Sequence, residues 1–229
     1  MPNIRILIAD DHEVVRRGLC ALLASHPGWE VCGEVADGRQ AVAKTSQLKP
    51  DLVILDLGMP NMNGLVAARQ ILRENPKQRV LILTVSDSEQ AVREAVQTGA
   101  RGFVHKSDAS QELIAAVEAL LQNRTHFSTM AGQVVLQDFV SDGDRASRRA
   151  TPKAMDLTAR EREIVQLLAE GKTSKEVANI LNVSVKTAET HRSNLMRKLG
   201  IHNLSEVVLY AVRNNIVQVQ GFNKQGLVR

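Results

Sequence analysis

Short apolar runs alternate with amphipathic segments through the first half of the chain. Five runs, most of them rich in Ile, Val and Leu, are typical of buried parallel strands; they lie at residues 4–9, 30–35, 52–55, 80–83 and 102–105. Apolar residues at helical spacing predict helices at about residues 14–23, 38–48, 65–72, 90–98 and 112–121, the last with a capping box of Asp108 and Gln111. The alternation predicts an α/β domain over residues 2–122, built on a doubly wound five-stranded parallel sheet.

The periodic pattern fades after residue 122 and returns near residue 156. We predict a linker over residues 123–155, because its part from 141 to 153 is polar and rich in turn-forming residues. Within it, residues 134–140 are compatible with a short helix. An all-α four-helix domain is expected over residues 156–217, and residues 218–229 are interpreted as a loose tail.

Start and stop signals in the second domain are explicit. Capping boxes are expected at Thr158 with Glu161 and at Thr173 with Glu176, and helix stops at Gly171, Asn182 and Gly200. The second helix, a three-residue turn at 182–184 and a longer third helix up to Leu199 predict a helix-turn-helix unit, with a fourth helix at 205–214.

The third helix of this domain has two different faces. One is expected to pack in the core and carries Ala188, His191, Leu195 and Leu199. The other is polar and carries Lys186, Glu189, Thr190, Ser193 and Arg197. The polar face is either a solvated surface, which is common, or a surface that reads DNA.

Polar side chains follow four of the expected strands at the point where each ends. Asp10 and Asp11 follow the first strand, Asp56 the third, Thr84 the fourth and Lys106 the fifth. Because parallel strands end at one edge of the sheet, where ligands bind in such folds, these groups should share a pocket. Carboxylates so close oppose each other's ionisation unless a cation joins them, and oxygen ligands suit Mg²⁺. We therefore expect Mg²⁺ and an aspartyl phosphate at Asp56, the alternative being that Asp56 merely caps the next turn.

Residues 2–122 resemble the receiver domain of two-component response regulators, on the order and spacing of Asp10-Asp11, Asp56, Met59-Pro60, Thr84 and Lys106. The resemblance implies a flavodoxin-like strand order and Asp56 as the phosphorylated residue. It implies that Asp11, Asp56 and the Gly58 carbonyl ligate Mg²⁺ while Asp10 holds the metal's waters. Thr84 and Lys106 would complete the catalytic set by taking the phosphoryl oxygens, and Thr84 with Phe103 would form the switch.

Two positions depart from the common receiver pattern. Phe103 stands where many receivers have Tyr, so no hydroxyl hydrogen bond can report its inward state. Ser107 stands where many have Pro, which disfavours a cis peptide after Lys106.

Residues 156–217 resemble the LuxR-type DNA-binding domain, on the stretches 157–163, 171–178 and 185–200. Together the two resemblances indicate the NarL/FixJ group of response regulators. The partner implied is double-stranded DNA, and the contacts that we expect come from Lys172, Thr173, Lys186, Thr187, Glu189, Thr190, Arg192, Ser193, Arg197 and Lys198. Of these, Glu189, Thr190 and Ser193 are expected to reach base edges, whereas Lys186, Arg192 and Lys198 are expected to bind phosphates.

Charge and composition agree with this division without deciding it. Residues 1–122 carry 13 Lys and Arg against 15 Asp and Glu, whereas residues 123–229 carry 16 against 10, so the second half is the candidate for binding a polyanion. No apolar run approaches the roughly 20 residues of a membrane span, and the chain enters a strand without a secretory signal, so we expect a cytoplasmic protein with no membrane partner. The 2 cysteines lack metal or redox spacing and are interpreted as reduced core thiols.

The function expected is that of a transcription regulator switched by phosphorylation of Asp56. By resemblance, a sensor histidine kinase would supply the phosphoryl group, and phosphorylation would favour a homodimer on DNA. It should not be a classical enzyme, although the receiver would catalyse its own phosphoryl transfer and dephosphorylation. One alternative is an aspartate-nucleophile phosphohydrolase, which would need a second Asp where this chain has Gly58. The other is a DNA-binding scaffold in which the acidic pocket is only structural.

Overall fold

The computed structural model describes residues 3–85, 89–127, 132, 157–214 and 216–217. The chain divides into two compact units, Met1–Asp156 and Leu157–Arg229, and each is described by itself. The helix expected at 134–140, most of the expected linker and the expected tail at 218–229 lie outside the described residues. Within the described ranges, every helix is too short or too polar to cross a bilayer.

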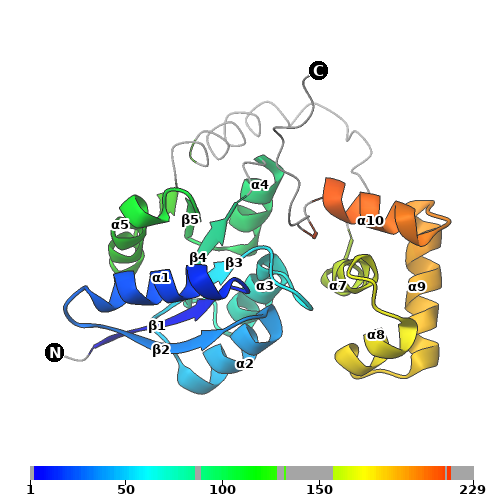
Figure 1. Ribbon diagram of the computed structural model, residues 1–229, viewed down its shortest axis with the longest axis horizontal. Coiled ribbons are helices and arrows are strands. Elements are labelled where there is room, and N and C mark those ends of the chain that lie inside the picture. Colours follow the sequence, from blue (N-terminus) through cyan, green and yellow to red (C-terminus); the bar gives the residue numbers. More distant parts are fainter. Residues whose placement is uncertain (1–2, 86–88, 128–131, 133–156, 215, 218–229) are drawn as a thin grey trace. The chain divides into compact units, whose positions relative to one another are not determined.

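The first unit is built on a parallel sheet with the strand order β2-β1-β3-β4-β5-β6 (Figure 1). The strands are β1 Ile4–Ala9, β2 Trp29–Val35, β3 Leu52–Asp56, β4 Arg79–Thr84, β5 Gly102–His105 and β6 His126–Phe127. The predicted doubly wound parallel sheet is confirmed, but its strand count was wrong by one. β6 lies in the segment interpreted as linker, and its two residues are too few to show a periodic pattern; pairing with the edge strand β5 makes it a strand.

Helices cover both faces of this sheet (Figure 1). They are α1 Glu13–Ala24, α2 Gly38–Leu48, α3 Gly64–Glu74, α4 Glu89–Thr98 and α5 Ala109–Leu121. Successive strand residues point to opposite faces, so Ile6 and Ile8 of β1 pack with α1 and α5, whereas Leu7 and Ala9 pack with α2, α3 and α4. The two apolar layers fix the strand ends from both sides.

The start of α5 differs from the prediction. The helix begins at Ala109 rather than near residue 112, and the Asp108 side chain makes no cap hydrogen bond. Its Oδ1 accepts instead from Ser107 Oγ at 2.7 Å. The capping-box prediction is wrong because Asp108 has a helical backbone (φ −97°, ψ −5°), whereas a capping side chain needs the extended backbone that turns it back toward the helix.

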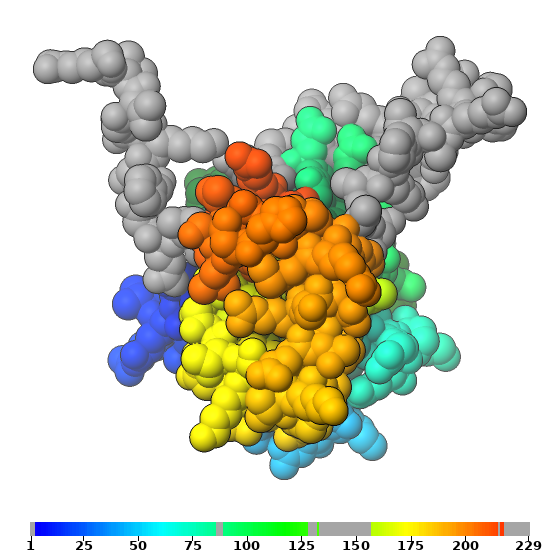
Figure 2. Space-filling model, turned by 90° about the vertical axis from the view of Figure 1, so that its right-hand side faces the viewer, coloured from blue at the N-terminus to red at the C-terminus, as the bar shows by residue number. Residues whose placement is uncertain are grey.

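The second unit contains α7 Ala159–Ala169, α8 Ser174–Leu181, α9 Val185–Leu199 and α10 Leu204–Arg213. Both predicted capping boxes, at Thr158 and at Thr173, are confirmed. The three expected stops all have positive φ: 79° at Gly171, 51° at Asn182 and 65° at Gly200. Side chains of α8 and α9, yellow to orange, lie together on the face seen in Figure 2. The helix-turn-helix arrangement therefore follows from local signals written into the sequence.

A close backbone contact positions Asp56 at the end of β3. Gly64, the first residue of α3, lies so near that a Cβ added there would be 2.2 Å from the Asp56 carbonyl oxygen. The N–H of Gly64 also donates to the carbonyl of Leu57 at 3.1 Å. Only glycine permits this approach, and the approach sets where the Asp56 side chain leaves the sheet.

Replacing Gly64 with Ala should therefore destabilise the first unit by about 1–3 kcal/mol, the usual cost of overpacking. Gly18→Ala in α1 is the matched control: a Cβ there meets nothing within 4 Å, and the change should raise the free energy of unfolding by up to about 1 kcal/mol. Urea titration followed by the fluorescence of Trp29, the 1 tryptophan in the chain, measures both variants. A Gly64 variant as stable as the wild type would contradict the close approach.

Candidate functional site

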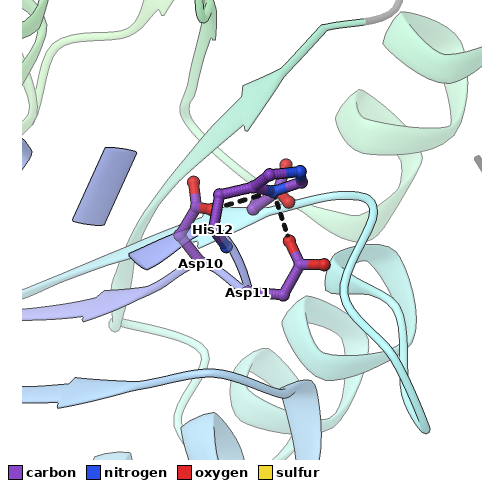
Figure 3. Close-up of side chains that lie close together, drawn as sticks. Asp10, Asp11 and His12 are labelled. Atoms are coloured by element: carbon purple, nitrogen blue, oxygen red, sulfur yellow. Dashed lines mark hydrogen bonds and ion pairs between the residues drawn. The ribbon is translucent and has the colours of Figure 1, made fainter. Parts of the chain in front are cut away.

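The end of β1 brings two carboxylates and an imidazole together. Asp10 follows β1 and is fully buried, and Asp11 and His12 lead into α1. His12 Nδ1 lies 2.7 Å from Asp11 Oδ1 and 3.5 Å from Asp10 Oδ1 (Figure 3). The backbone N–H of His12 donates to Asp10 Oδ1 at 2.9 Å. The Asp10 carboxylate, which faces the pocket, thus also holds the turn between β1 and α1 in place.

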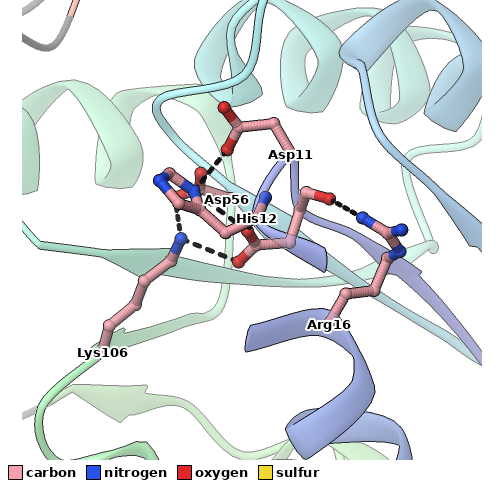
Figure 4. Close-up of polar contacts among 6 residues, drawn as sticks. Asp11, His12, Arg16, Asp56 and Lys106 are labelled. Carbon is pink, nitrogen blue, oxygen red and sulfur yellow. Dashed lines mark hydrogen bonds and ion pairs between the residues drawn. The ribbon is translucent and has the colours of Figure 1, made fainter. Parts of the chain in front are cut away.

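Lys106 reaches this cluster from the end of β5. Its Nζ lies 2.7 Å from Asp10 Oδ2 and 3.0 Å from Asp56 Oδ1, so one ammonium bridges two carboxylates (Figure 4). The Lys106 side chain is 9% exposed and both carboxylate side chains are 1% exposed. The Lys106 N–H donates to the carbonyl of Thr84 at 2.7 Å, which sets the buried Thr84 beside it. The groups predicted at four strand ends thus converge on one edge of the sheet.

Burial dominates the electrostatics of Asp56. Desolvation raises the pKa of its carboxyl group from 3.8 to about 6; the Lys106 ammonium lowers the pKa, and the Asp10 carboxylate raises it. The nearby N–H of Gly58 lowers it further, yet neither Asp56 oxygen has a partner in hydrogen-bond geometry among the described residues. Lys106 therefore compensates only part of the charge that the fold buries.

The donor set fits a hard divalent cation. One ligand atom each from Asp10, Asp11, His12 and Asp56 lies within 4.8 Å of all the others. Lys106 contacts Asp10 Oδ2 and Asp56 Oδ1, and His12 contacts Asp11 Oδ1, as ion pairs; no aligned hydrogen bond reaches these buried oxygens or Asp56 Oδ2 in the described part of the chain. Buried carboxylate oxygens in that condition cost free energy that a bound cation recovers. The cluster is therefore chemically suited to a metal ion.

Two residues of this pocket were not singled out from the sequence. His12 lies between the acidic pair and the helical pattern, and its nearness to the carboxylates depends on how the turn after β1 folds. Arg16 lies in α1, where its Nη1 donates to the carbonyl of Asp10 at 2.7 Å and its Nε lies 3.3 Å from Glu34 Oε2. The only signal in the sequence is their spacing: His12 follows Asp11 by one position and Arg16 follows it by five.

The remaining expected receiver residues lie around the pocket. Phe103 is 2% exposed and packs in the core on the side of α2, α3 and α4. Gly58 lies in the turn that joins β3 to α3, and its role as a carbonyl ligand stays a prediction. The peptide bond between Lys106 and Ser107 is trans, as the sequence predicted.

The outward face of α9 carries most of the residues that the sequence predicts to contact DNA. Ala188 and Leu195 are buried as predicted, and the residues expected to contact DNA that lie exposed are Thr173, Lys186, Thr187, Glu189, Thr190, Ser193 and Arg197. Lys172, Arg192 and Lys198 are half-buried. Glu189 has no polar partner among the described residues, and it lies beyond the first turn of α9, which contains no acidic residue. The alternative that Glu189 is there only to stabilise the N-terminus of α9 through the helix dipole is therefore weakened, because that effect is confined to the first turn.

Two of the residues expected to contact DNA, Lys198 and Thr187, already make polar contacts within the second unit. Lys198 Nζ lies 2.7 Å from Glu161 Oε2, which also accepts from the N–H of Thr158 in the capping box of α7. Thr187 Oγ1 lies 2.8 Å from Ser184 Oγ at the start of α9. Lys198 joins the end of α9 to the start of α7, so it is less available to a phosphate than the exposed Lys186.

Family models match two parts of the chain. The response regulator receiver domain matches residues 6–118, and the luxR family of bacterial regulatory proteins matches residues 155–211. The first match contains the whole acidic pocket, and the second contains the helix-turn-helix.

Known proteins match over nearly the full length. The oxygen regulatory protein NreC of Staphylococcus aureus is 34% identical over 216 residues, which are 94% of this chain and 100% of NreC. The structure of RcsB from Salmonella enterica serovar Typhimurium bound to promoter P1flhDC in the presence of the phosphomimetic BeF3- is 26% identical, with a TM-score of 0.60 over 92% of this chain and 99% of that one. A LuxR-family two-component response regulator from Aurantimonas sp. SI85-9A1 is 34% identical, with a TM-score of 0.57 over 60% of this chain and 99% of that one.

The sheet-edge pocket, the helix-turn-helix and these matches agree along the chain. It belongs to the two-component response regulators that join a receiver domain to a LuxR-type DNA-binding domain.

Proposed function

We propose that Asp56 is the phosphoryl acceptor through which this phosphorylation-dependent transcription regulator is switched. The observation that carries the proposal is the buried Asp56 carboxylate at the end of the central strand β3, with Lys106 Nζ 3.0 Å from its Oδ1. A carboxylate so placed is a nucleophile with a cation beside it. Its donor would be the sensor kinase that is the usual partner of a receiver domain.

Each residue of the pocket would have a role in the transfer. An Asp56 oxygen attacks phosphorus, the bond from phosphorus to the donor breaks, and the leaving group stays with the donor. Asp11, Asp56 and the Gly58 carbonyl would hold Mg²⁺, with Asp10 orienting its waters. The ion supplies charge neutralisation between the carboxylates and the phosphoryl oxygens. Lys106 and the Thr84 hydroxyl would bind those oxygens once Lys106 gives up its contacts to the carboxylates.

The phosphoryl group would then alter the surface of the receiver. Drawing Thr84 toward the new charge empties space beside β5, and Phe103 would repack in the core that it already occupies. The altered surface would favour a homodimer that binds two half-sites on double-stranded DNA. In support, the solved structures of RcsB include two dimers bound to two parallel DNAs.

The two alternatives predict different behaviour. The phosphohydrolase lacks its second carboxylate, because Gly58 stands two residues after Asp56. A scaffold without a switch would keep its oligomeric state when Mg²⁺ and beryllofluoride, a phosphoryl mimic, are added. The proposed switch would change it.

The first test concerns the acceptor itself. Asp56→Asn should abolish labelling of the protein by a small phosphodonor with Mg²⁺, because a neutral amide lacks the carboxylate oxygen that attacks phosphorus. Asp37→Asn is the matched control: Asp37 caps α2 by accepting from the Gln40 N–H at 2.9 Å, and Asn preserves such a cap. Labelling is read by mass spectrometry of the intact chain. Retained labelling of the Asp56 variant would place the acceptor elsewhere.

A second expected outcome concerns pH and stability without a divalent cation. The pKa of Asp56 rises from 3.8 to about 6 on folding, so between these values the folded protein holds a proton that the unfolded chain has lost. Stability therefore falls as pH rises through this window, and the cost is complete above it. Asp56→Asn should be more stable than the wild type at pH 8 by on the order of 2–3 kcal/mol, and should lose most of that advantage near pH 4.

Urea titration followed by Trp29 fluorescence provides the measurement. Saturating Mg²⁺ at pH 8 is the control, because it should stabilise the wild type more than the variant. A variant that is less stable than the wild type at pH 8 without Mg²⁺ would show that the buried charge is fully compensated by the protein.

A third expected outcome separates base reading from phosphate binding on α9. Glu189→Gln should relax or change preference at one base pair per half-site by about 1–3 kcal/mol, since a carboxylate there is best explained by accepting from a cytosine amino group. Lys186→Ala should weaken all sequences alike and lower the salt slope by about one. Selection from random DNA, followed by binding titrations at several salt concentrations, measures both. If Lys186→Ala loses base preference while Glu189→Gln keeps it, the two roles are reversed.

A further inference from the structure

We propose that His12 adds an imidazole nitrogen to the cation site in the pocket of Asp10, Asp11 and Asp56, which makes it a mixed nitrogen and oxygen site for first-row transition dications such as Co²⁺ as well as for Mg²⁺. This inference rests on the proposed cation site and extends it to the choice of metal. Its basis is the place of the imidazole beside the carboxylates (Figures 3 and 4).

The separations around His12 are those of ligands that share one ion. Two ligand atoms about 2.1 Å from an ion and at right angles to each other lie about 3 Å apart. His12 Nδ1 is 2.7 Å from Asp11 Oδ1 and 3.5 Å from Asp10 Oδ1, which brackets that value. The whole set, Asp56 included, lies within 4.8 Å, so a small inward movement would complete the site.

The close approach of His12 to Asp11 is not a directed hydrogen bond. Asp11 Oδ1 is buried and has no partner in hydrogen-bond geometry in the described part of the chain, although the imidazole nitrogen is 2.7 Å away. The contact is that of an ion pair, and two atoms at this separation are also close enough to coordinate one cation in its place.

A second, independent observation points to the same place. Asp56 is 1% exposed, and its Oδ2 has no hydrogen-bond partner among the described residues. Lys106 contacts Oδ1 of Asp56 and Oδ2 of Asp10, whereas His12 approaches Oδ1 of Asp10. Lys106 and His12 therefore use different oxygens of Asp10, and a cation next to His12 would not displace the lysine.

The chemistry of the imidazole then determines which ions gain. Mg²⁺ prefers oxygen and keeps several waters, so His12 adds little to its binding. Imidazole suits later first-row ions, whose affinity for such sites rises along the series from Mn²⁺ to Cu²⁺. The pocket would thus bind Co²⁺ more tightly than a site of carboxylates and water alone.

Co²⁺ is the probe, and full-length protein is the sample. In the wild type, the proton NMR spectrum with one equivalent of Co²⁺ should contain a strongly shifted, solvent-exchangeable imidazole N–H resonance, from Nε2 of a histidine bound through Nδ1. His12→Gln should lose it, and its Co²⁺ affinity by calorimetry should fall about tenfold or more. Its Mg²⁺ affinity should stay within about threefold, which also shows that the pocket remains folded.

His26→Gln is the matched control, because His26 lies at the other end of α1 and stacks on Trp29 at 3.8 Å between ring centroids. It should keep both the resonance and the Co²⁺ affinity. A resonance or an unchanged Co²⁺ affinity in His12→Gln would overturn the inference.

Asp11→Asn separates this failure from failure of the proposed function. If Asp11→Asn weakens Mg²⁺ and Co²⁺ binding but His12→Gln weakens neither, the cation site stands and only the ligand role of His12 is wrong. If Asp11→Asn leaves both affinities unchanged, the cations bind elsewhere and both proposals are wrong.

Discussion

The burial of two carboxylates beside one ammonium is the constraint on which the first unit depends. Asp10 and Asp56 are almost inaccessible to water, and Lys106 is their shared partner. Such an arrangement is costly in isolation, because desolvation favours the protonated acid. The apolar layers on both faces of the sheet supply the stability that offsets this cost, and they hold the carboxylates where a bound cation would lower it. The buried charge that suits the pocket to a cation is thus the same charge that costs the first unit folding free energy.

The second unit solves a different physical problem. Most of the residues that we expect to contact DNA are exposed, and the clearest signals in the sequence of this unit are those that begin and end its helices. The capping boxes at Thr158 and Thr173 define two helix starts, and residues with positive φ at Asn182 and Gly200 define two ends. The ion pair from Lys198 to Glu161 then ties the end of α9 to a capping residue of α7. Recognition depends here on the fixed orientation of an exposed helix, rather than on buried charge.

Sequence patterns predicted the parallel sheet, the pocket at its edge and the helix-turn-helix, because each follows from local periodicity or from the rule that parallel strands end together. They failed where tertiary context decides. β6 exists through pairing with β5, and the backbone of Asp108 turns its side chain away from the helix that it precedes. The place of His12 beside Asp11 depends on the fold of one turn, and the ion pair of Lys198 joins residues 37 positions apart. Neither contact has a periodic signature.

The division of labour along α9 has a consequence for the divergence of regulators. Ala188 and Leu195 hold the helix in the core, whereas Glu189 and Ser193 project from it and bear no packing load. Exchanging such exposed side chains usually changes stability by less than about 0.5 kcal/mol. With Glu189 and Ser193 reading bases as proposed, a duplicated gene would acquire a new set of target promoters through a few substitutions on this face that leave stability almost unchanged, while its receiver continued to answer the old signal. Rewiring of a regulatory network would then be limited by the overlap of binding sites and not by folding.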